Sequence, residues 1–412
     1  MENFLDRAKR ALPAIRNWIR SGGVKTNGPQ GEPGSASGPD GQTLSLQIVR
    51  SISRGERVPG LPEAFCSAFD TAPLATLDDR FVGRAESLGV IESAIAQWRT
   101  GGSAMLVVTA PQGAGLSSFL AKVPALLPAG EQFDSRAFAS RICHSEDVLA
   151  TVASWFQLEQ TPASAHALII QLRAAAPRVI LVDDAHYLVN RLAELEAVRV
   201  FGSILVATQD RHLWILGCRR HAFTRLVYLH QADRFFSHLL ELPYFSQDEL
   251  AEVVRLRLQR AGLSLTDDED ASADVPAGLG AGRLRELHQC SGGKPDLAFA
   301  GLLRASRAVG GGSHAQMARP SAVDVSVLQK LERPELLALA EMVAHGNLSV
   351  AEHGGIFRVP VASSALSLSY LYNLGLVDTI GGEDDESAVR YAVVKPIWAL
   401  VVKHLETANY LY

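Results

Sequence analysis

The sequence lacks the features that mark several classes of protein. Its four cysteines are too far apart for a metal-binding motif, and we interpret them as the reduced thiols of a cytosolic protein: Cys66, Cys143, Cys218 and Cys290. No apolar run approaches the roughly 20 residues that a membrane-spanning helix needs. The first residues show no signal-peptide pattern. The formal net charge is only −5 at pH 7, so no global charge attracts the chain to nucleic acid or anionic lipid. We expect a cytoplasmic protein.

The first 43 positions combine a basic amphipathic pattern with a tether. Residues 2–20 place apolar side chains on one helical stripe and arginines and lysines beside it. Such a helix can pack on its own domain or on a partner, contact a membrane surface, or stay disordered, and these alternatives stay open. Residues 21–43 are rich in Gly, Pro and Ser and cannot bury a core.

The rest of the chain is organised around a strand, a glycine turn and a helix. Met105–Thr109 is a short apolar run typical of a buried parallel strand, Ala110–Gly115 is a turn with two glycines, and a helix begins near Ser117. This arrangement exposes backbone N–H groups at a helix N-terminus, where the helix dipole also favours an anion. The stretch therefore predicts a phosphate-binding loop.

The loop departs from the P-loop pattern G-x-x-x-x-G-K-[ST] at two positions. Gly115 and Ser117 agree with the pattern, whereas Ala110 replaces its first glycine and Leu116 replaces its lysine. That lysine is the charge that meets the β- and γ-phosphates. Its loss removes a charged contact of about 1.5–3 kcal/mol. The alternative that Leu116 packs as an ordinary apolar residue beside an empty loop stays open.

Two carboxylates follow a second buried strand. Residues 178–184 read RVILVDD, and the carboxyl ends of strands in an open α/β sheet face the crevice where ligands bind. We expect Asp183 to hold Mg²⁺ through water and Asp184 to orient an attacking water. Residues 203–210 are interpreted as another strand, which brings Gln209 to the same crevice.

The remaining periodicities predict further elements. Helices are expected over residues 44–53, 85–98, 146–156, 163–176, 222–230, 248–260, 283–290 and 295–307. Strands are expected over residues 138–143 and 238–242. The last 92 positions, 321–412, predict helices at 324–331, 334–344, 361–374 and 397–408, with a hairpin of 377–380 and 389–394. Helices followed by a two-stranded wing are the order of a winged helix.

The middle of the chain resembles the AAA+ class of P-loop ATPases, and within it the origin-recognition proteins and the signal-transduction ATPases called STAND. The resemblance rests on FVGR at Phe81–Arg84, the Walker A loop, the Walker B strand Val179–Asp183 and SGGKPDLA from Ser291. It implies an α/β fold: a parallel sheet with helices on both faces, a helical lid and a winged helix. It also implies ATP held by Phe81, Val82, Gly113, Ala114, Gly115, Leu116, Ser117 and Ser118, with Mg²⁺ at Ser117 and Asp183.

The same resemblance implies catalytic roles and shows where this chain departs from them. Beside Asp183 and Asp184, Gln209 stands at the sensor-1 position, and Arg234 matches a finger that acts on a neighbour's nucleotide. Asp184 stands where the class usually has glutamate, and Asp296 stands where origin-type lids have the sensor-2 arginine. Together with the missing lysine, these departures argue against fast hydrolysis.

The motifs divide the chain into an amphipathic helix at 1–21, a linker and irregular segment at 22–78, a P-loop core at 79–245, a helical lid at 246–308, a linker at 309–320 and a winged helix at 321–412. Residues 321–412 are acidic, and the candidate recognition helix of this part, residues 361–374, has no positive side chain. Because phosphate neutralisation supplies most nonspecific DNA affinity, protein docking is favoured over DNA there. Because segments of the predicted lid are basic, DNA binding through the ATPase core stays open as an alternative.

Three hypotheses follow. The first is a degenerate nucleotide-binding switch or scaffold subunit that works beside a competent ATPase or an effector in a homo- or hetero-oligomer. The second is a slow ATPase that remodels a nucleic-acid or protein complex, with another cation in place of the missing lysine. The third is a DNA-binding protein that uses the core and the winged helix without hydrolysis.

Overall fold

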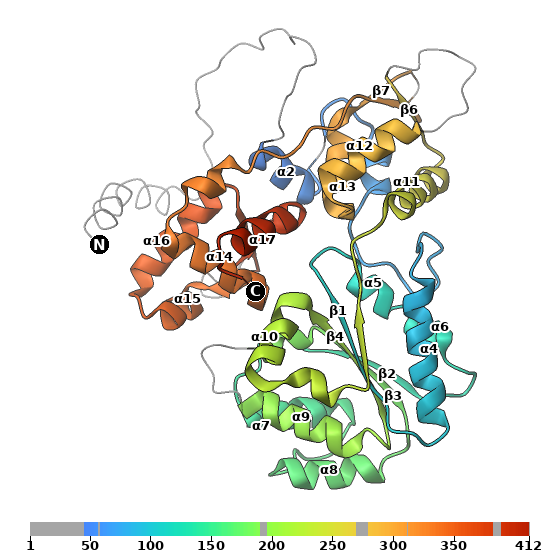
Figure 1. The fold of residues 1–412 in the computed structure, drawn as a ribbon, viewed down its shortest axis with the longest axis vertical. Helices are drawn as coiled ribbons and strands as arrows, with labels where there is room; N and C mark the ends of the chain where they lie inside the picture. Colours follow the sequence, from blue (N-terminus) through green and yellow to red (C-terminus); the bar gives the residue numbers. More distant parts are fainter. Residues whose placement is uncertain are drawn as a thin grey trace.

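The computed structural model describes residues 45–56, 58–189, 196–268, 279–310, 312–381 and 389–411. Figure 1 shows three groups of elements: a sheet flanked by helices, a smaller group above it in yellow and orange, and the C-terminal elements in orange and red. The predicted amphipathic helix and residues 382–388, between the two strands of the predicted hairpin, lie outside the described residues. No described helix is long and apolar enough to cross a membrane.

The first group is built on five parallel strands in the order β2-β3-β4-β1-β5. They are β1 (Met105–Ala110), β2 (Phe133–Ala137), β3 (Val179–Asp183), β4 (Leu213–Arg219) and β5 (His238–Glu241). All six residues of β1 are buried, as expected for a central strand with both faces covered. Because the strands are parallel, their carboxyl ends meet at one edge, where the glycine turn and the Walker B aspartates lie.

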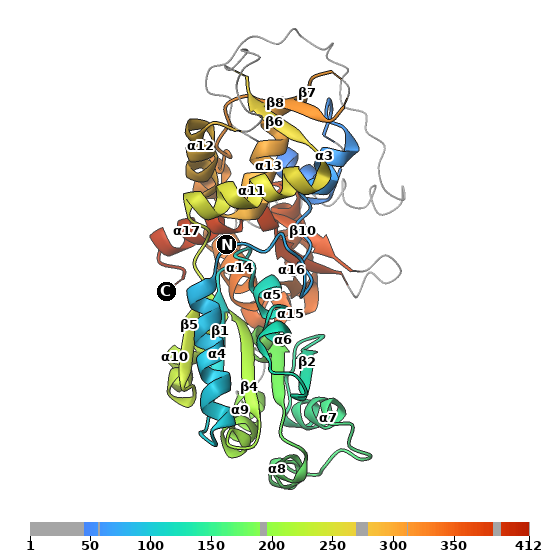
Figure 2. The same cartoon turned by 90° about the vertical axis from the view of Figure 1, so that its right-hand side faces the viewer.

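Helices cover both faces of this sheet (Figures 1 and 2). One face packs against α7 (Ser145–Trp155), α8 (Ala165–Ala174), α9 (Glu196–Thr208) and α10 (Arg220–His230). The other packs against α4 (Ala85–Arg99), α5 (Leu116–Leu120) and α6 (Val123–Leu126). The period of two along β1 explains the division, because Met105 and Val107 join the first core and Leu106 and Val108 the second.

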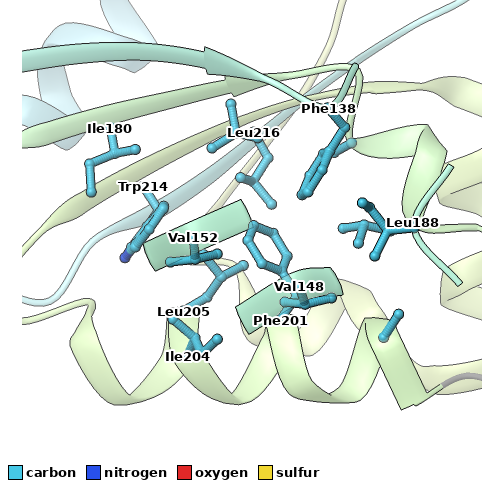
Figure 3. Packing of buried hydrophobic residues seen from close by; sticks show 14 of the residues in the cluster. Phe138, Val148, Val152, Ile180, Leu188, Phe201, Ile204, Leu205, Trp214 and Leu216 are labelled. Carbon is cyan, nitrogen blue, oxygen red and sulfur yellow. The ribbon is translucent and has the colours of Figure 1, made fainter. Parts of the chain in front are cut away.

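Aromatic side chains fill the larger of these two cores. The Phe138 and Phe201 ring centroids lie 5.5 Å apart in an edge-to-face arrangement, and Phe201 and Trp214 are 6.3 Å apart. Figure 3 shows these rings between the sheet and the helices, beside Val148 and Val152 of α7. Edge-to-face pairs of this kind add about 0.5–1.5 kcal/mol to the burial of apolar area, and they join α9 to the sheet.

The second group is the lid. It contains α11 (Gln247–Ala261), α12 (Ala281–Ser291) and α13 (Pro295–Ala305), with a sheet of β6 (Ser264–Asp267), β8 (His314–Met317) and β7 (Ser306–Ala308) in that order. The predicted helix over 248–260 is confirmed, with a capping box on Ser246 and Gly262 at its C-cap. The short helix α3 (Glu63–Ala68) joins this core through Phe65.

The third group begins with η3 (Ser326–Lys330), α14 (Arg333–His345), β9 (Leu348–Ser349), α15 (Val350–Phe357) and α16 (Val361–Asn373). It ends with β10 (Val377–Ile380), β11 (Arg390–Val393), η5 (Lys395–Ile397) and α17 (Trp398–Thr407), and its sheet has the order β10-β11-β9. The predicted hairpin is confirmed. The helix α2 (Leu46–Ser53) from the other end of the chain packs here, because Leu46 and Val49 belong to this core.

Several expectations were wrong. Residues 203–210 are not a strand: α9 continues to Thr208, because its buried side chains recur at the helical spacing of Phe201, Ile204, Leu205 and Thr208. The strand predicted over 138–143 lies five residues earlier, as β2. The linker predicted over 309–320 contains β8, whose Ala315 and Met317 are fully buried. Four alternating residues inside a Gly/Ser-rich stretch are too short a signal for sequence periodicity.

Candidate functional site

The glycine turn after β1 has the conformation that an anion cradle requires. Gly113 and Gly115 have φ angles of 82° and 86°, a left-handed region that other residues adopt only with strain. Gly115 is the N-cap of α5, so the backbone N–H groups of the first turn are free of intrahelical partners. The predicted loop residues 113–118 all line one cavity.

Ser117 and Asp183 meet as predicted. The Ser117 hydroxyl donates a hydrogen bond of 2.9 Å to Oδ2 of Asp183, across 66 positions of sequence. The amide of Asp184 donates to the other oxygen, Oδ1, at 2.7 Å, which fixes the carboxylate. A hydroxyl beside a carboxylate is a donor set that Mg²⁺ accepts, and the residues fit that ion. No cluster of three or more His, Cys, Asp or Glu side chains among the described residues could hold a metal, so such an ion needs phosphate and water as its other ligands.

Asp184 is the titratable group of the site. It takes a left-handed conformation, with a φ of 56°. Burial, and then the charge of Asp183, raises the pKa of Asp184 to about 6. His186 Nδ1 lies 3.6 Å from Oδ1 of Asp184, and burial lowers the pKa of His186 to about 2. The imidazole is therefore neutral at physiological pH, and it offers Asp184 no opposite charge.

Arg219 is a site residue that the sequence reasoning missed. It ends β4 and lines the cavity beside Asp183 and Asp184. Burial lowers its pKa, and the charge of Asp184 opposes that effect. The available signal is the buried run LWILGC, which Arg219 and Arg220 follow directly, but the apolar run within residues 203–210 competes with it for the same strand.

Gln209 and Arg234 do not reach the cavity of their own chain. Gln209 follows α9 and precedes β4, and Arg234 lies in η2 (Ala232–Phe235), which precedes β5. Because both positions come before parallel strands, they lie at the sheet edge opposite the glycine turn. The expectation that Gln209 faces the crevice is therefore wrong, and Arg219 holds the place expected for it. Arg234 is exposed, and its action on a neighbour's nucleotide stays a prediction.

The cavity has a volume of about 270 Å³ and lies between the core, the lid and the C-terminal elements. The predicted Phe81 and Val82 line it, together with Val253 and Phe299 of the lid. These side chains form an apolar end, and the glycine turn and the aspartates form a polar end. This combination suits a ligand with a flat apolar part and an anionic part.

The segment before α4 is tied to the first helical turn after the loop. The Leu74 amide donates to the Ser118 hydroxyl at 2.9 Å. The ammonium of Lys122 donates to the carbonyls of Thr76 and Asp78 at 2.8 and 2.7 Å and lies 5.1 Å from the centroid of the Phe81 ring. Ser118, predicted to bind the cofactor, therefore positions the chain segment that carries Phe81.

Several cations around the cavity already have partners in the described structure. Arg84 donates to the Pro243 carbonyl at 2.7 Å and lies 4.6 Å from the centroid of the Phe245 ring. Arg257 donates to the carbonyls of Ala68 and Asp70, both at 2.8 Å. Arg80 pairs with Asp78 at 2.6 Å. These three arginines hold the segment around the cavity, and each keeps only part of its donor capacity for a ligand.

The comparison with known protein families agrees with this geometry. Residues 73–276 match the model of the family described as Novel STAND NTPase 1. Among solved structures, the ORC2 protein of Aeropyrum pernix is 14% identical over 83% of this chain and 98% of its own, with a TM-score of 0.43. The Walker-type ATPase of Pyrococcus abyssi is 13% identical over 82% of this chain and 99% of its own, with a TM-score of 0.41. The comparison with curated proteins gives no match.

The matched segment contains the glycine turn, the Walker B strand and all five strands of the parallel sheet. Residues 73–276 therefore resemble a STAND NTPase domain and contain a five-stranded parallel sheet with a P-loop-like glycine turn.

Proposed function

We propose that this protein is a nucleotide-responsive switch or scaffold subunit that binds ATP or ADP with Mg²⁺ and hydrolyses ATP slowly or not at all. The observation that carries the proposal is the pairing of Ser117 with Asp183 at 2.9 Å beneath the two left-handed glycines. A cavity of about 270 Å³ with an apolar end opens directly onto this pair. The three features together suit a nucleotide phosphate, its metal ion and its base.

Slow turnover is inferred from the charges on the core side of the cavity. Leu116 brings no cation to the loop and packs with the apolar core cluster beneath it. Asp184, with a pKa of about 6, carries a shorter side chain than the glutamate of related ATPases. Stabilisation of developing charge usually contributes more to catalysis than any other single effect, and this loop offers little of it.

The switch is inferred from the way in which the C-terminal elements close the cavity. Lys395 of η5 lines the cavity, and the Arg219 guanidinium lies 5.5 Å from the centroid of the Trp398 ring. Another C-terminal element, α15, is held to the core by Arg141, whose Nη1 lies 2.7 Å from Oε1 of Glu352. A ligand that changes its contacts with Lys395 or Arg219 would change the relative stability of this packing.

Protein partners are proposed because α16 exposes apolar side chains and carries no positive charge. The outward face of α16 exposes Val361 and Tyr370, with exposed fractions of 65% and 42%. No Lys or Arg lies between Val361 and Asn373. A surface without positive charge does not attract a phosphate backbone, so we favour a protein, such as a competent ATPase or an effector, over DNA.

Calorimetric titration of the purified protein with Mg²⁺ and ADP or ATP tests the proposal, with Leu116→Lys measured in parallel. We expect wild type to bind with a Kd in the micromolar range and binding to weaken when Mg²⁺ is chelated. Absence of binding by wild type at millimolar nucleotide would overturn the switch. If Leu116→Lys then bound nucleotide, the loop would be intact but unused, and the protein would act as a scaffold alone.

A slow ATPase is the second candidate, and the contact of Asp183 with Ser117 and Asp184 favours it. Phosphate release measured with excess protein over hours would detect such an activity. We expect any genuine turnover to disappear in Asp183→Ala, whereas turnover that persists in this variant would come from a contaminant.

A further inference from the structure

A lysine of the lid is buried against the glycine turn. Lys294 lies in the turn between α12 and α13, and none of its surface is exposed. The turn is held rigidly: Gly292 and Gly293 have φ angles of 60° and 75°, and the Phe245 amide donates to the Gly293 carbonyl at 3.0 Å. Pro295 then starts α13. A fully buried lysine is rare, because removing a charge from water is energetically costly.

The Lys294 side chain ends at the phosphate loop. A Cβ placed on Gly113 would lie 2.5 Å from its Cε and 3.4 Å from its Nζ. The ammonium donates a hydrogen bond to the main-chain carbonyl of Lys395. An ammonium has three donors, so this single described bond leaves capacity for a further acceptor at Gly113.

The loop itself lacks the cation that a phosphate at this place requires. Leu116 stands at the lysine position, and Arg80, Arg84 and Arg257 hold the surrounding chain through the contacts described above. Arg219 faces Asp184 at the end of β4. Lys395 lines the cavity, whereas Lys294 lies behind the lining and is the described lysine packed against Gly113, in the turn where the β- and γ-phosphates would lie.

We propose that Lys294 takes the place of the missing P-loop lysine and binds the β- and γ-phosphates of a nucleotide from the lid side. This inference rests on the proposed nucleotide site and names the residue that supplies its charge. Because the cation belongs to the lid and not to the loop, phosphate affinity depends on the position of the lid. A change that moves α12 and α13 away from Gly113 would lower the affinity for nucleotide without altering the loop.

The charged neighbours of Lys294 set the strength of this contact. Burial lowers the pKa of Lys294 to about 8, against the opposing charge of Asp296, while Lys395 lowers it further. Lys294 therefore stays largely protonated at pH 7. Oδ2 of Asp296 would lie 3.1 Å from a Cβ on Gly113. Burial raises the pKa of Asp296, and the charge of Lys294 opposes that effect, so the charged form of Asp296 competes with phosphate for the ammonium. Removing that carboxylate charge should strengthen nucleotide binding.

Titration of ADP with Mg²⁺ into four variants tests the proposal. Lys294→Met keeps the buried volume and removes the charge, and we expect it to weaken binding at least tenfold. Leu116→Lys combined with Lys294→Met should recover most of the affinity, because the loop then carries its own lysine. Asp296→Asn should tighten binding severalfold. Lys403→Gln, which removes an exposed lysine of α17, should match wild type.

The outcomes separate this inference from the proposed function. Wild-type binding that Lys294→Met leaves unchanged would overturn the role of Lys294 and keep the nucleotide site. Absence of wild-type binding would overturn both. Thermal unfolding followed by circular dichroism shows whether each variant is folded. If Lys294→Met fails to fold, Asp296→Asn decides, because unchanged or weaker binding in that variant would contradict the proposal.

Discussion

The two sides of the cavity differ in what each contributes. The core side, defined as Gly113, Gly115, Ser117 and Asp183, has two left-handed glycines and a hydrogen bond from Ser117 to Asp183, a donor set that would suit Mg²⁺, but it has no cation on the loop. The lid side, defined as Lys294, Pro295 and Asp296, contributes Pro295 and Asp296 to the cavity lining and packs the buried Lys294 ammonium against Gly113. The difference teaches that the geometry and the charge of one site can come from different parts of a chain.

The largest expected effect comes from a substitution that disturbs the core side and the lid side together. Gly113→Val places a branched side chain at a φ of 82° and against the Cε of Lys294. We expect nucleotide binding to be lost and the free energy of unfolding to fall by about 1–3 kcal/mol from backbone strain. Calorimetry and denaturant unfolding measure the two effects.

Gly130→Val is the matched control for this change. Gly130 has a φ of 88°, and no atom lies within 4 Å of the position that a Cβ would occupy there. The variant should therefore show the strain without the clash, and bind nucleotide like wild type. Equal loss of binding in both variants would mean that strain alone explains the result for Gly113, and that contact with the lid has no part in it.

The next effect isolates the core side. Asp183→Asn removes the carboxylate charge that pairs with Ser117 and would hold Mg²⁺. We expect binding to weaken about 10- to 100-fold, which is the usual cost of disturbing a metal site, and to lose its dependence on Mg²⁺. Titrations with and without a chelator measure this. A variant that still needs Mg²⁺ as much as wild type would place the metal ion elsewhere.

A smaller effect concerns the third contributor, the end of β4. Arg219→Gln removes the cation beside Asp183 and Asp184, where the terminal phosphate of ATP would lie. We expect a severalfold loss of affinity for ATP and little change for ADP. The ratio of the two dissociation constants is the measurement. Equal losses for both nucleotides would show that Arg219 does not distinguish the terminal phosphate.

The smallest expected effect is the pH-dependent contribution of Asp184 to the free energy of unfolding. The pKa of Asp184 is raised from 3.8 to about 6, so the folded state disfavours its charged form. The folded state therefore binds the Asp184 proton more tightly than the unfolded chain does. The stability that this proton binding contributes is complete below the ordinary pKa and is lost as the pH rises through about 6. The Asp184 side chain is 44% exposed, so we expect a cost of only about 1 kcal/mol after screening.

Asp184→Asn should therefore be more stable than wild type at pH 8 by about this amount. The gap should close as pH falls from 6 towards 4, where wild-type Asp184 is protonated. Thermal unfolding across this range measures the difference. A gap that stays constant with pH would assign the stabilisation to something other than the charge of Asp184.

The core side of the site could be predicted from the sequence because its signals are local. The run Met105–Ala110, the glycines and Ser117 are adjacent, and the strand Val179–Asp183 carries its own pattern. Parallel strands align their carboxyl ends, so the meeting of Ser117 and Asp183 follows from two local predictions. The same reasoning failed for Gln209, because a short apolar run suits a strand and a buried helix equally well.

The lid side could not be predicted from the sequence in this way. In the sequence, Lys294 is one residue of a turn that reads SGGKP, and no local pattern distinguishes it from a solvent-exposed lysine. Its burial results from the packing of α13 against η5 and from the approach of the turn to Gly113, 181 positions earlier. Contacts at such a separation depend on the position of the whole lid, which periodicity does not encode.

The sequence by itself determined the strand, the glycine turn and the paired aspartates, because short-range sterics and the parallel sheet dictate where they lie. It also determined that Leu116 brings no charge to the loop. Only the tertiary structure decided which cations surround the cavity. Arg219 lines it from the end of β4, and Lys294 of the lid packs against the glycine turn in its wall, because packing of whole elements places a charge where the local sequence has none.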